Sequence, residues 1–149
     1  MTLAPLPPLA RRYLKASVAF FVYGILIGLH ISAALNLGWG AFRGGYVAAH
    51  THVLLIGFLS MLLAGLALWR LPEQERSARS WIPGTAWWLL VLTVLGRSTC
   101  EILRGYSMDD SMWRAVGMAV FAASTLQACA LGALAVHLVR RVTNQRPGP

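Results

Sequence analysis

The chain alternates between long apolar runs and short polar connections. The apolar runs lie at residues 16–38, 47–69, 81–103 and 113–139. A helix rises 1.5 Å per residue, so each run is long enough to cross the roughly 30 Å core of a bilayer. We therefore predict an all-α fold, an integral membrane four-helix bundle. The connections leave no room for another domain, so residues 1–149 should form a single transmembrane domain.

Composition supports this assignment. The 149 residues are 57% hydrophobic and 12% charged, with a mean hydropathy of +0.60, whereas a soluble domain has about 25% charged residues. The net charge of +8 is carried by side chains beside the apolar runs, where Lys and Arg determine topology. We therefore expect a lipid bilayer as partner and no nucleic acid. Cys100 and Cys129 lie in different runs and suggest no disulfide framework.

The basic residues divide unevenly between the two sides of the predicted bundle. One side has Arg43, and also Arg104 and Arg114, which are diluted by two aspartates. The richer side holds the N-terminal segment, the connection after the second run and the C-terminal tail, with Arg11, Arg12, Lys15, Arg70, Arg76, Arg79, Arg140, Arg141 and Arg146. The positive-inside rule then places both termini in the cytoplasm. We expect a multi-pass protein of the cell inner membrane.

Few ionisable side chains lie at membrane depth, and such residues indicate functional sites. His30 lies about 12 Å inside the first run, and His50 and His52 lie about 5 and 7 Å inside the second. Arg97 and Glu101 are four residues apart near the end of the third run and can form an ion pair. The three histidines and Arg97 should therefore lie in the outer half of the bundle, although they come from three helices.

The two neighbouring histidines should face different ways. Positions 50 and 52 of one helix are about 200° apart, so His50 and His52 cannot both face one ligand. The stripe through His52 is bulky, whereas the stripe through His50 includes small residues and comprises Leu54, Gly57, Met61, Ala64 and Gly65. Small residues allow a neighbouring helix or a flat cofactor to approach. We therefore expect His50 to be the inward ligand, and His52 to serve a neighbouring subunit or to hydrogen-bond at the surface.

Each polar residue also has a simpler interpretation. A single histidine near a membrane interface is more often a hydrogen-bonded packing residue than a ligand. Three histidines at similar depth on two adjacent helices favour ligation instead. Arg97 and Glu101 can form a snorkelling interfacial ion pair, or Arg97 can neutralise an acidic group of a cofactor.

The second run resembles a known helix. The stretch AHTHVLLIGFLSMLLAGLALWRLP is similar to the haem-ligand helix of haem-copper oxidase subunit I, including the nitric oxide reductases. It is more similar still to small four-helix proteins with the motif His-x-His-(Leu/Val)-x-Leu-x-Gly-(Phe/Trp), a later Gly and a Leu-Pro. The matching residues are His50, His52, Val53, Leu55, Gly57, Phe58, Gly65, Leu71 and Pro72. With the preceding LKASVAFFVYGILIGL, the resemblance covers about the first half of the chain.

The resemblance implies a haem b cofactor. No Cys-x-x-Cys-His is present, so attachment should be non-covalent. His50 is the expected axial ligand, and the second comes from His30, His52, Met118 or another subunit. Gly57 should line the cofactor site, and Arg97 should lie near the haem propionates.

The departures from the family limit the expected function. Four helices without a copper-site histidine cluster or a Tyr–His crosslink candidate cannot by themselves form a haem-copper oxidase or nitric oxide reductase. We therefore expect a b-type cytochrome, a homo-oligomer, in electron transfer or the binding of NO, O₂ or CO, with a respiratory-chain enzyme as a candidate partner. The alternative is an accessory or assembly protein for a respiratory haem-copper enzyme, whose histidines bind copper or form an interface.

Overall fold

The computed structural model describes residues 5–71, 81–106 and 109–143, and within these ranges the regular structure is helical. The elements are α1 (Pro8–Leu37), α2 (Gly44–His52), η1 (Val53–Ser60), α3 (Met61–Arg70), α5 (Ile82–Leu103) and α6 (Asp110–Thr143). Because α2, η1 and α3 are continuous, these elements form four helices in the described residues, each long and apolar enough to cross a membrane. The prediction of an all-α chain with four membrane-length helices is confirmed, which indicates a multi-pass membrane protein.

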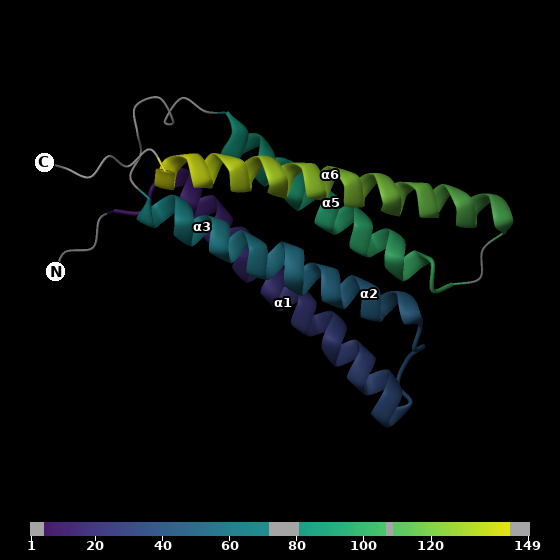
Figure 1. Ribbon diagram of the computed structural model, residues 1–149. Helices are drawn as coiled ribbons and strands as arrows, with labels where there is room; N and C mark the ends of the chain where they lie inside the picture. Colours follow the sequence, from purple (N-terminus) through teal and green to yellow (C-terminus); the bar gives the residue numbers. More distant parts are fainter. Residues whose placement is uncertain (1–4, 72–80, 107–108, 144–149) are drawn as a thin grey trace, which may run out of the picture.

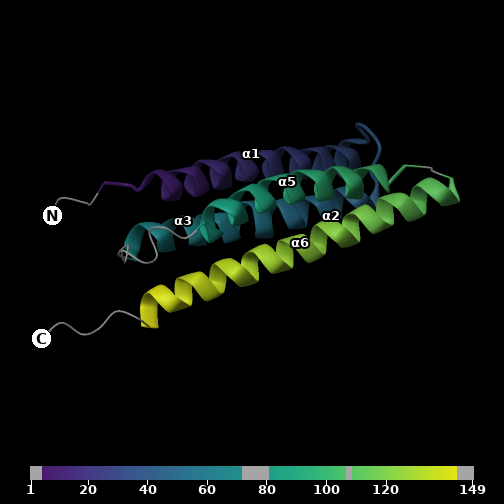
Figure 2. The ribbon, with the colours of Figure 1, turned by 90° about the horizontal axis from the view of Figure 1, so that it is seen from above.

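The four helices run side by side as two pairs. α1 packs along α2, η1 and α3, whereas α6 packs chiefly on α5 (Figure 2). The pairs are joined mainly where α5 lies against α2. α1 begins and α6 ends at the same end of the bundle (Figure 1). We call this the terminal end, and the opposite end, where α2 begins and α5 finishes, the distal end.

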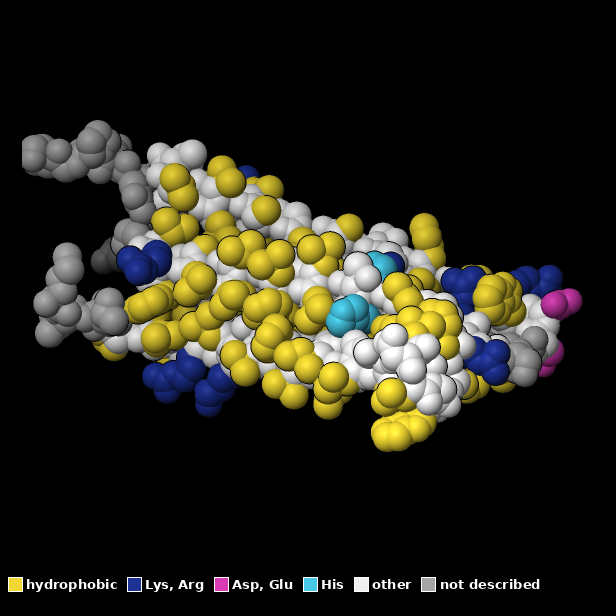
Figure 3. Space-filling view, turned by 90° about the horizontal axis from the view of Figure 1, so that it is seen from below, with side chains coloured by type: hydrophobic (Ala, Val, Ile, Leu, Met, Phe, Trp, Pro, Cys, Tyr) yellow, Lys and Arg dark blue, Asp and Glu magenta, His cyan; other side chains and the backbone are white. Residues whose placement is uncertain are grey.

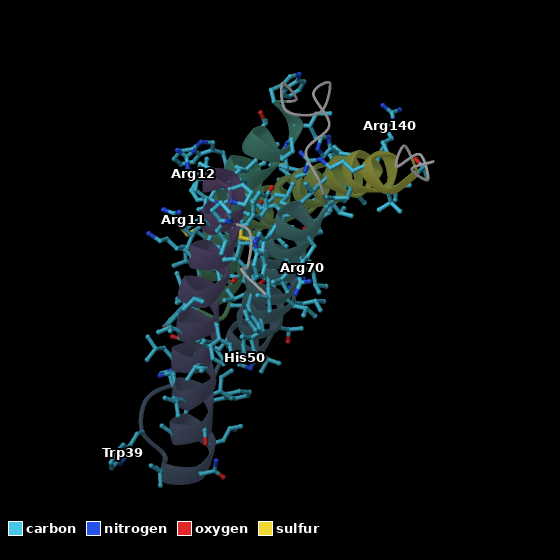
Figure 4. All side chains as sticks on the ribbon, turned by 90° about the vertical axis from the view of Figure 1, so that its left-hand side faces the viewer. Arg11, Arg12, Trp39, His50, Arg70 and Arg140 are labelled. Carbon is cyan, nitrogen blue, oxygen red and sulfur yellow. The ribbon has the colours of Figure 1, made fainter. Side chains whose placement is uncertain are left out.

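Two of the helices are longer than the apolar runs. α1 begins at Pro8, well before the predicted start at residue 16, and α6 continues to Thr143. Proline suits the first turn of a helix, where its missing N–H has no intrahelical partner. Arg11 and Arg12 therefore lie on the helix, and they project outward with Arg140 (Figure 4). The topology residues Arg76, Arg79 and Arg146 and the motif residue Pro72 lie outside the described residues.

The outer surface of the bundle is apolar along its middle. Figure 3 shows hydrophobic side chains covering this region, with Lys and Arg gathered toward both ends. Leu26 on α1, Leu63 on α3 and Phe121 on α6 are all more than half exposed. Such a continuous apolar surface is unusual for a soluble monomer. It fits the bilayer partner that the composition predicts.

The second helix changes type immediately after the histidines. Val53–Ser60 form a π-helix, whose hydrogen bonds join residues five apart instead of four. The Ser60 hydroxyl also donates to the carbonyl of Leu55, five residues back, at 3.0 Å. π segments inside α-helices are frequent at functional sites. The sequence pattern did not predict this segment.

Candidate functional site

His50 lies against α1. Its Nδ1 is 2.9 Å from the carbonyl oxygen of Gly24. A carbonyl oxygen only accepts, so Nδ1 must carry the proton, and Nε2 is the ring nitrogen left for a ligand. A Cβ added at Gly28 would lie 2.9 Å from Cε1 of His50. The ring therefore packs on the backbone of α1, in a position that only glycine at residue 28 allows without a shift.

His50 also lines an apolar groove between α1 and the second helix, and Figure 4 labels its position beside α1. The groove has a volume of about 440 Å³ and is otherwise lined by Phe21, Thr51, Leu54, Leu55, Phe58 and Leu59. The rings of Phe21 and Phe58 meet with their centroids 4.8 Å apart. The Thr51 hydroxyl donates to the Val47 carbonyl. The imidazole of His50 is thus the polar group in this groove with a nitrogen free to bind. We call it the His50 groove.

Gly57 permits helix packing. A Cβ at this position would lie 2.7 Å from Cγ of Phe20 on α1, so the Phe20 ring fills the space beside it. Of the two occupants expected beside the small residues, a neighbouring helix or a flat cofactor, the structure has the helix. The expected contact of Gly57 with a cofactor stays a prediction.

His52 faces α5, away from the His50 groove. Its Nδ1 lies 3.1 Å from Oε1 of Glu101 and 2.9 Å from the carbonyl oxygen of Ala48. The prediction that the two histidines face different ways is confirmed. The His52 side chain is 27% exposed and hydrogen-bonded, but its partner on another helix is a buried carboxylate of α5 in the same chain. A contact of His52 with a neighbouring subunit stays a prediction.

The His52–Glu101 contact belongs to a polar network that joins three helices. Arg97 donates through Nε to Oε1 of Glu101 at 2.9 Å, which confirms the predicted pair, and through Nη1 to Oε1 of Gln127 on α6 at 3.3 Å. Glu101 and Gln127 are 6% and 3% exposed. We call His52, Glu101, Arg97 and Gln127 the polar network. Because these contacts turn Arg97 toward α6, its role beside haem propionates stays a prediction that the geometry does not favour.

Sequence reasoning missed Gln127. The signal was a single amide side chain in the middle of a helix made mostly of small and apolar residues. An amide at that depth requires a hydrogen-bond partner, since an unpaired one is costly in an apolar medium. Its partner, Arg97, could be identified only once the packing of α6 on α5 was known.

None of the candidate second ligands lines the His50 groove. The ring of His30 packs on Tyr46, one turn before His50, with centroids 4.5 Å apart. Nε2 of His30 is buried without a hydrogen-bond partner among the described residues. Met118 is 69% exposed on α6. A second axial ligand from His30, His52 or Met118 therefore stays a prediction. The three histidines lie at similar depth, but His30 contacts Tyr46, His50 contacts α1 and His52 contacts α5.

In the described part of the chain, no group of three or more His, Cys, Asp or Glu side chains is placed to hold a metal ion. The described residues place one imidazole in an apolar groove and, separately, a buried ion pair at this level of the bundle. No known protein family, curated protein or solved structure matches the chain.

Proposed function

We propose that this chain is a haem b-binding membrane protein of the b-type cytochrome class, with His50 as an axial ligand. It would act in electron transfer or in binding a diatomic gas such as NO, O₂ or CO. The observation that carries the proposal is the 2.9 Å contact between Nδ1 of His50 and the Gly24 carbonyl. Histidines that bind metals usually donate their other ring N–H to a carbonyl or carboxylate, which fixes the tautomer and the ring orientation.

The residues of the His50 groove fit a haem. Its volume of about 440 Å³ lies within the range of roughly 300–1,000 Å³ that small-molecule and cofactor sites occupy. Its lining is almost entirely aliphatic and aromatic, with one free imidazole nitrogen. Haem supplies an iron that changes oxidation state or binds a gas, and the axial ligand and burial tune its potential.

Each neighbouring residue has a definite task in this site. The Gly24 carbonyl accepts the hydrogen bond of the Nδ1 proton, which leaves Nε2 as the ring nitrogen with a lone pair for a ligand. Gly28 leaves room for the imidazole against the backbone of α1. Phe21 and Phe58 exclude water from the groove and offer aromatic surface to a macrocycle. No second histidine of the described residues lines the groove, so these residues would hold a haem through one imidazole, and a gas or a residue of another subunit would be a further candidate ligand.

An absorption spectrum of the purified full chain tests the proposal. After expression with sufficient haem, the wild type should show a Soret band, and His50→Ala should lose it because the free ring nitrogen is gone. His52→Ala and His30→Ala are matched controls that remove the same side chain outside the groove, and both should retain the band. A wild-type protein without a Soret band, or a His50→Ala variant that keeps one, contradicts the proposal.

Carbon monoxide difference spectra then separate the two roles. A five-coordinate haem that binds carbon monoxide supports gas binding. A six-coordinate haem that does not respond supports electron transfer, with the second ligand from another subunit. Copurification with a respiratory oxidase and no stoichiometric haem would favour the alternative, an assembly role, over either.

A further inference from the structure

A second cavity lies at the distal end, between α2, the end of α5 and the start of α6. Its volume is about 450 Å³, and its lining comprises Gly44, Gly45, Ala48, Glu101, Arg104, Gly105 and Trp113. It shares no lining residue with the His50 groove. We call it the distal cavity. In contrast to the His50 groove, its wall carries an acidic and a basic side chain.

Both charged side chains have an atom without a partner. Oε1 of Glu101 contacts Arg97 and His52, but Oε2 is buried with no hydrogen-bond partner among the described residues. Nε of Arg104 is likewise buried and unpaired within the described ranges. Leaving such an atom unpaired in the folded protein is costly, and more so for a charged group. Residues three apart on a helix are neighbours, so the unpaired acceptor and the unpaired donor belong to adjacent lining residues on one wall of the cavity.

The first turn of α2 adds donors to the same cavity. Gly44 and Gly45 are its first two residues and line the cavity, and no side chain caps this helix end. The first N–H groups of a helix have no intrahelical partner and, with the helix dipole, attract anions. A Cβ at Gly45 would collide with the carbonyl of Glu101. The N-terminus of α2 therefore lies directly against the part of α5 that carries the two charged residues.

Trp113 on α6 holds the guanidinium of Arg104 in position. The guanidinium carbon lies 4.2 Å from the ring centroid of Trp113, within the range of a cation–π interaction. This contact satisfies the flat face of the guanidinium but not the Nε–H, which still lacks an acceptor. The distal cavity thus has a fixed cationic donor, a helix N-terminus and a carboxylate oxygen.

We propose that the distal cavity binds a phosphate ester that also carries an ammonium group, the head-group chemistry of phosphatidylethanolamine. The ammonium would donate to Oε2 of Glu101, and the phosphate would accept from Nε of Arg104 and from the N–H groups of Gly44 and Gly45. A simple anion would leave Oε2 unpaired and meet its negative charge. A simple cation would leave Nε unpaired. A zwitterion satisfies both atoms, and the cavity lies where apolar helices end, at the level of lipid head groups.

A competition between two lipids tests the proposal on the wild-type protein. The purified full chain is exchanged into mixed micelles with equal amounts of phosphatidylethanolamine and phosphatidylglycerol of the same acyl chains, and retained lipid is measured by native mass spectrometry. The ethanolamine lipid should be retained about tenfold more, since it alone gains a charged hydrogen bond with Glu101. Equal retention of the two lipids overturns the proposal.

A parallel arm distinguishes a membrane lipid from a soluble ligand. Soluble phosphoethanolamine, titrated into lipid-free protein, should bind if the head group alone is recognised. Binding of phosphatidylethanolamine without binding of phosphoethanolamine identifies the lipid as the source. Binding of neither compound contradicts the proposal, whatever the haem content of the sample.

Variants assign the two ends of the ligand. Glu101→Gln should reduce the preference for the ethanolamine lipid to near equality, and Arg104→Gln should weaken retention of both lipids about tenfold. Arg114→Gln is the matched control, because Arg114 is an exposed arginine on α6 outside the cavity lining, and it should retain lipid as the wild type does. Unchanged retention by Arg104→Gln overturns the proposed phosphate site. Helix content of each variant is checked by circular dichroism, and if Glu101→Gln does not fold, the wild-type competition decides.

Discussion

His50 and His52 are two residues apart on one helix and have opposite surroundings. His50 is held by a single backbone carbonyl of α1 and lines an apolar groove. His52 contacts a buried carboxylate that is itself paired with an arginine, in a network that spans α2, α5 and α6. Both rings are held through Nδ1, one by a backbone carbonyl of α1 beside an apolar groove and the other by a carboxylate of the polar network.

The difference shows how position decides the use of a side chain. In an apolar medium an ionised group must be paired, and removal of one partner leaves the other uncompensated. Glu101 and Arg97 meet this requirement together, and His52 and Gln127 add hydrogen bonds to them. A neutral imidazole needs only one partner for its N–H, which a helix carbonyl can provide. The His50 side of the helix can therefore stay apolar, whereas the His52 side needs the paired charges of α5.

Glu101→Ala is expected to have the largest effect, because it breaks the polar network and leaves Arg97 inside the bundle without its anion. Loss of one partner of a buried ion pair costs about 3–5 kcal/mol. Denaturant unfolding of wild type and variant in detergent measures the change. The double variant Arg97→Met with Glu101→Leu removes both charges and should recover most of the loss. Equal destabilisation of the single and double variants would show that the charges are not the cause.

Gly28→Ala tests the packing of His50 on α1 and should have an intermediate effect on stability. The new Cβ would lie 2.9 Å from Cε1 of His50, so the ring must shift, and such overpacking costs about 1–3 kcal/mol. If the haem proposal holds, the Soret band should also weaken. Gly96→Ala is the matched control on α5, where nothing lies within 4 Å of the added Cβ, and it should gain up to about 1 kcal/mol. The same response from both variants would contradict a tight seat for His50.

Asp109→Ala should have the smallest effect on stability. Asp109 directly precedes α6, which supplies Gln127 to the polar network but lines no part of the His50 groove, so haem binding should not change. Asp109 accepts hydrogen bonds from the Met112 N–H and the Ser111 hydroxyl, both at 2.7 Å. These two hydrogen bonds, the larger effect coming from Met112, hold the pKa of Asp109 below its usual value. A lowered pKa contributes stability that is present above the unfolded value of about 4 and is lost as the pH falls through the folded value.

Thermal melting over a pH series checks this prediction. The wild type should melt above Asp109→Ala at neutral pH, and the difference should shrink as the solution becomes more acidic than about pH 4. Asp109→Asn keeps an acceptor for the Met112 N–H but does not titrate, so it should melt close to the wild type and show no such pH dependence. A difference in melting temperature that persists in acid would contradict a stabilising role for the ionised Asp109 carboxylate.

The sequence predicted what depends on local spacing. Four membrane-length helices follow from hydropathy and length, the Arg97–Glu101 pair follows from its four-residue spacing, and the divergence of His50 and His52 follows from the helical repeat. Each of these features is a property of one helix. They can be predicted without knowing how the helices pack on one another.

Contacts between helices could not be predicted in the same way. Whether His52 meets lipid or Glu101 depends on how far α2 is rotated toward α5, and hydropathy hardly constrains that rotation in a chain that is apolar on most sides. Gln127 could be recognised as a polar residue at depth, but its partner lies on another helix. The early start of α1 was missed because Arg11, Arg12 and Lys15 interrupt the apolar run without interrupting the helix.

The π segment Val53–Ser60 lies between the two histidines and the residues of α3 that pack on α1. It therefore sets how far α2 is rotated relative to α3 within one continuous helix. Removal of a single residue from a helix turns everything before it by about 100° relative to everything after it. A one-residue deletion inside this segment would leave the hydropathy profile almost unchanged, and Met61 and Leu68 could stay packed. Yet it would turn both histidines away from their present partner helices, so the direction of each imidazole depends on the number of residues in the segment that follows it.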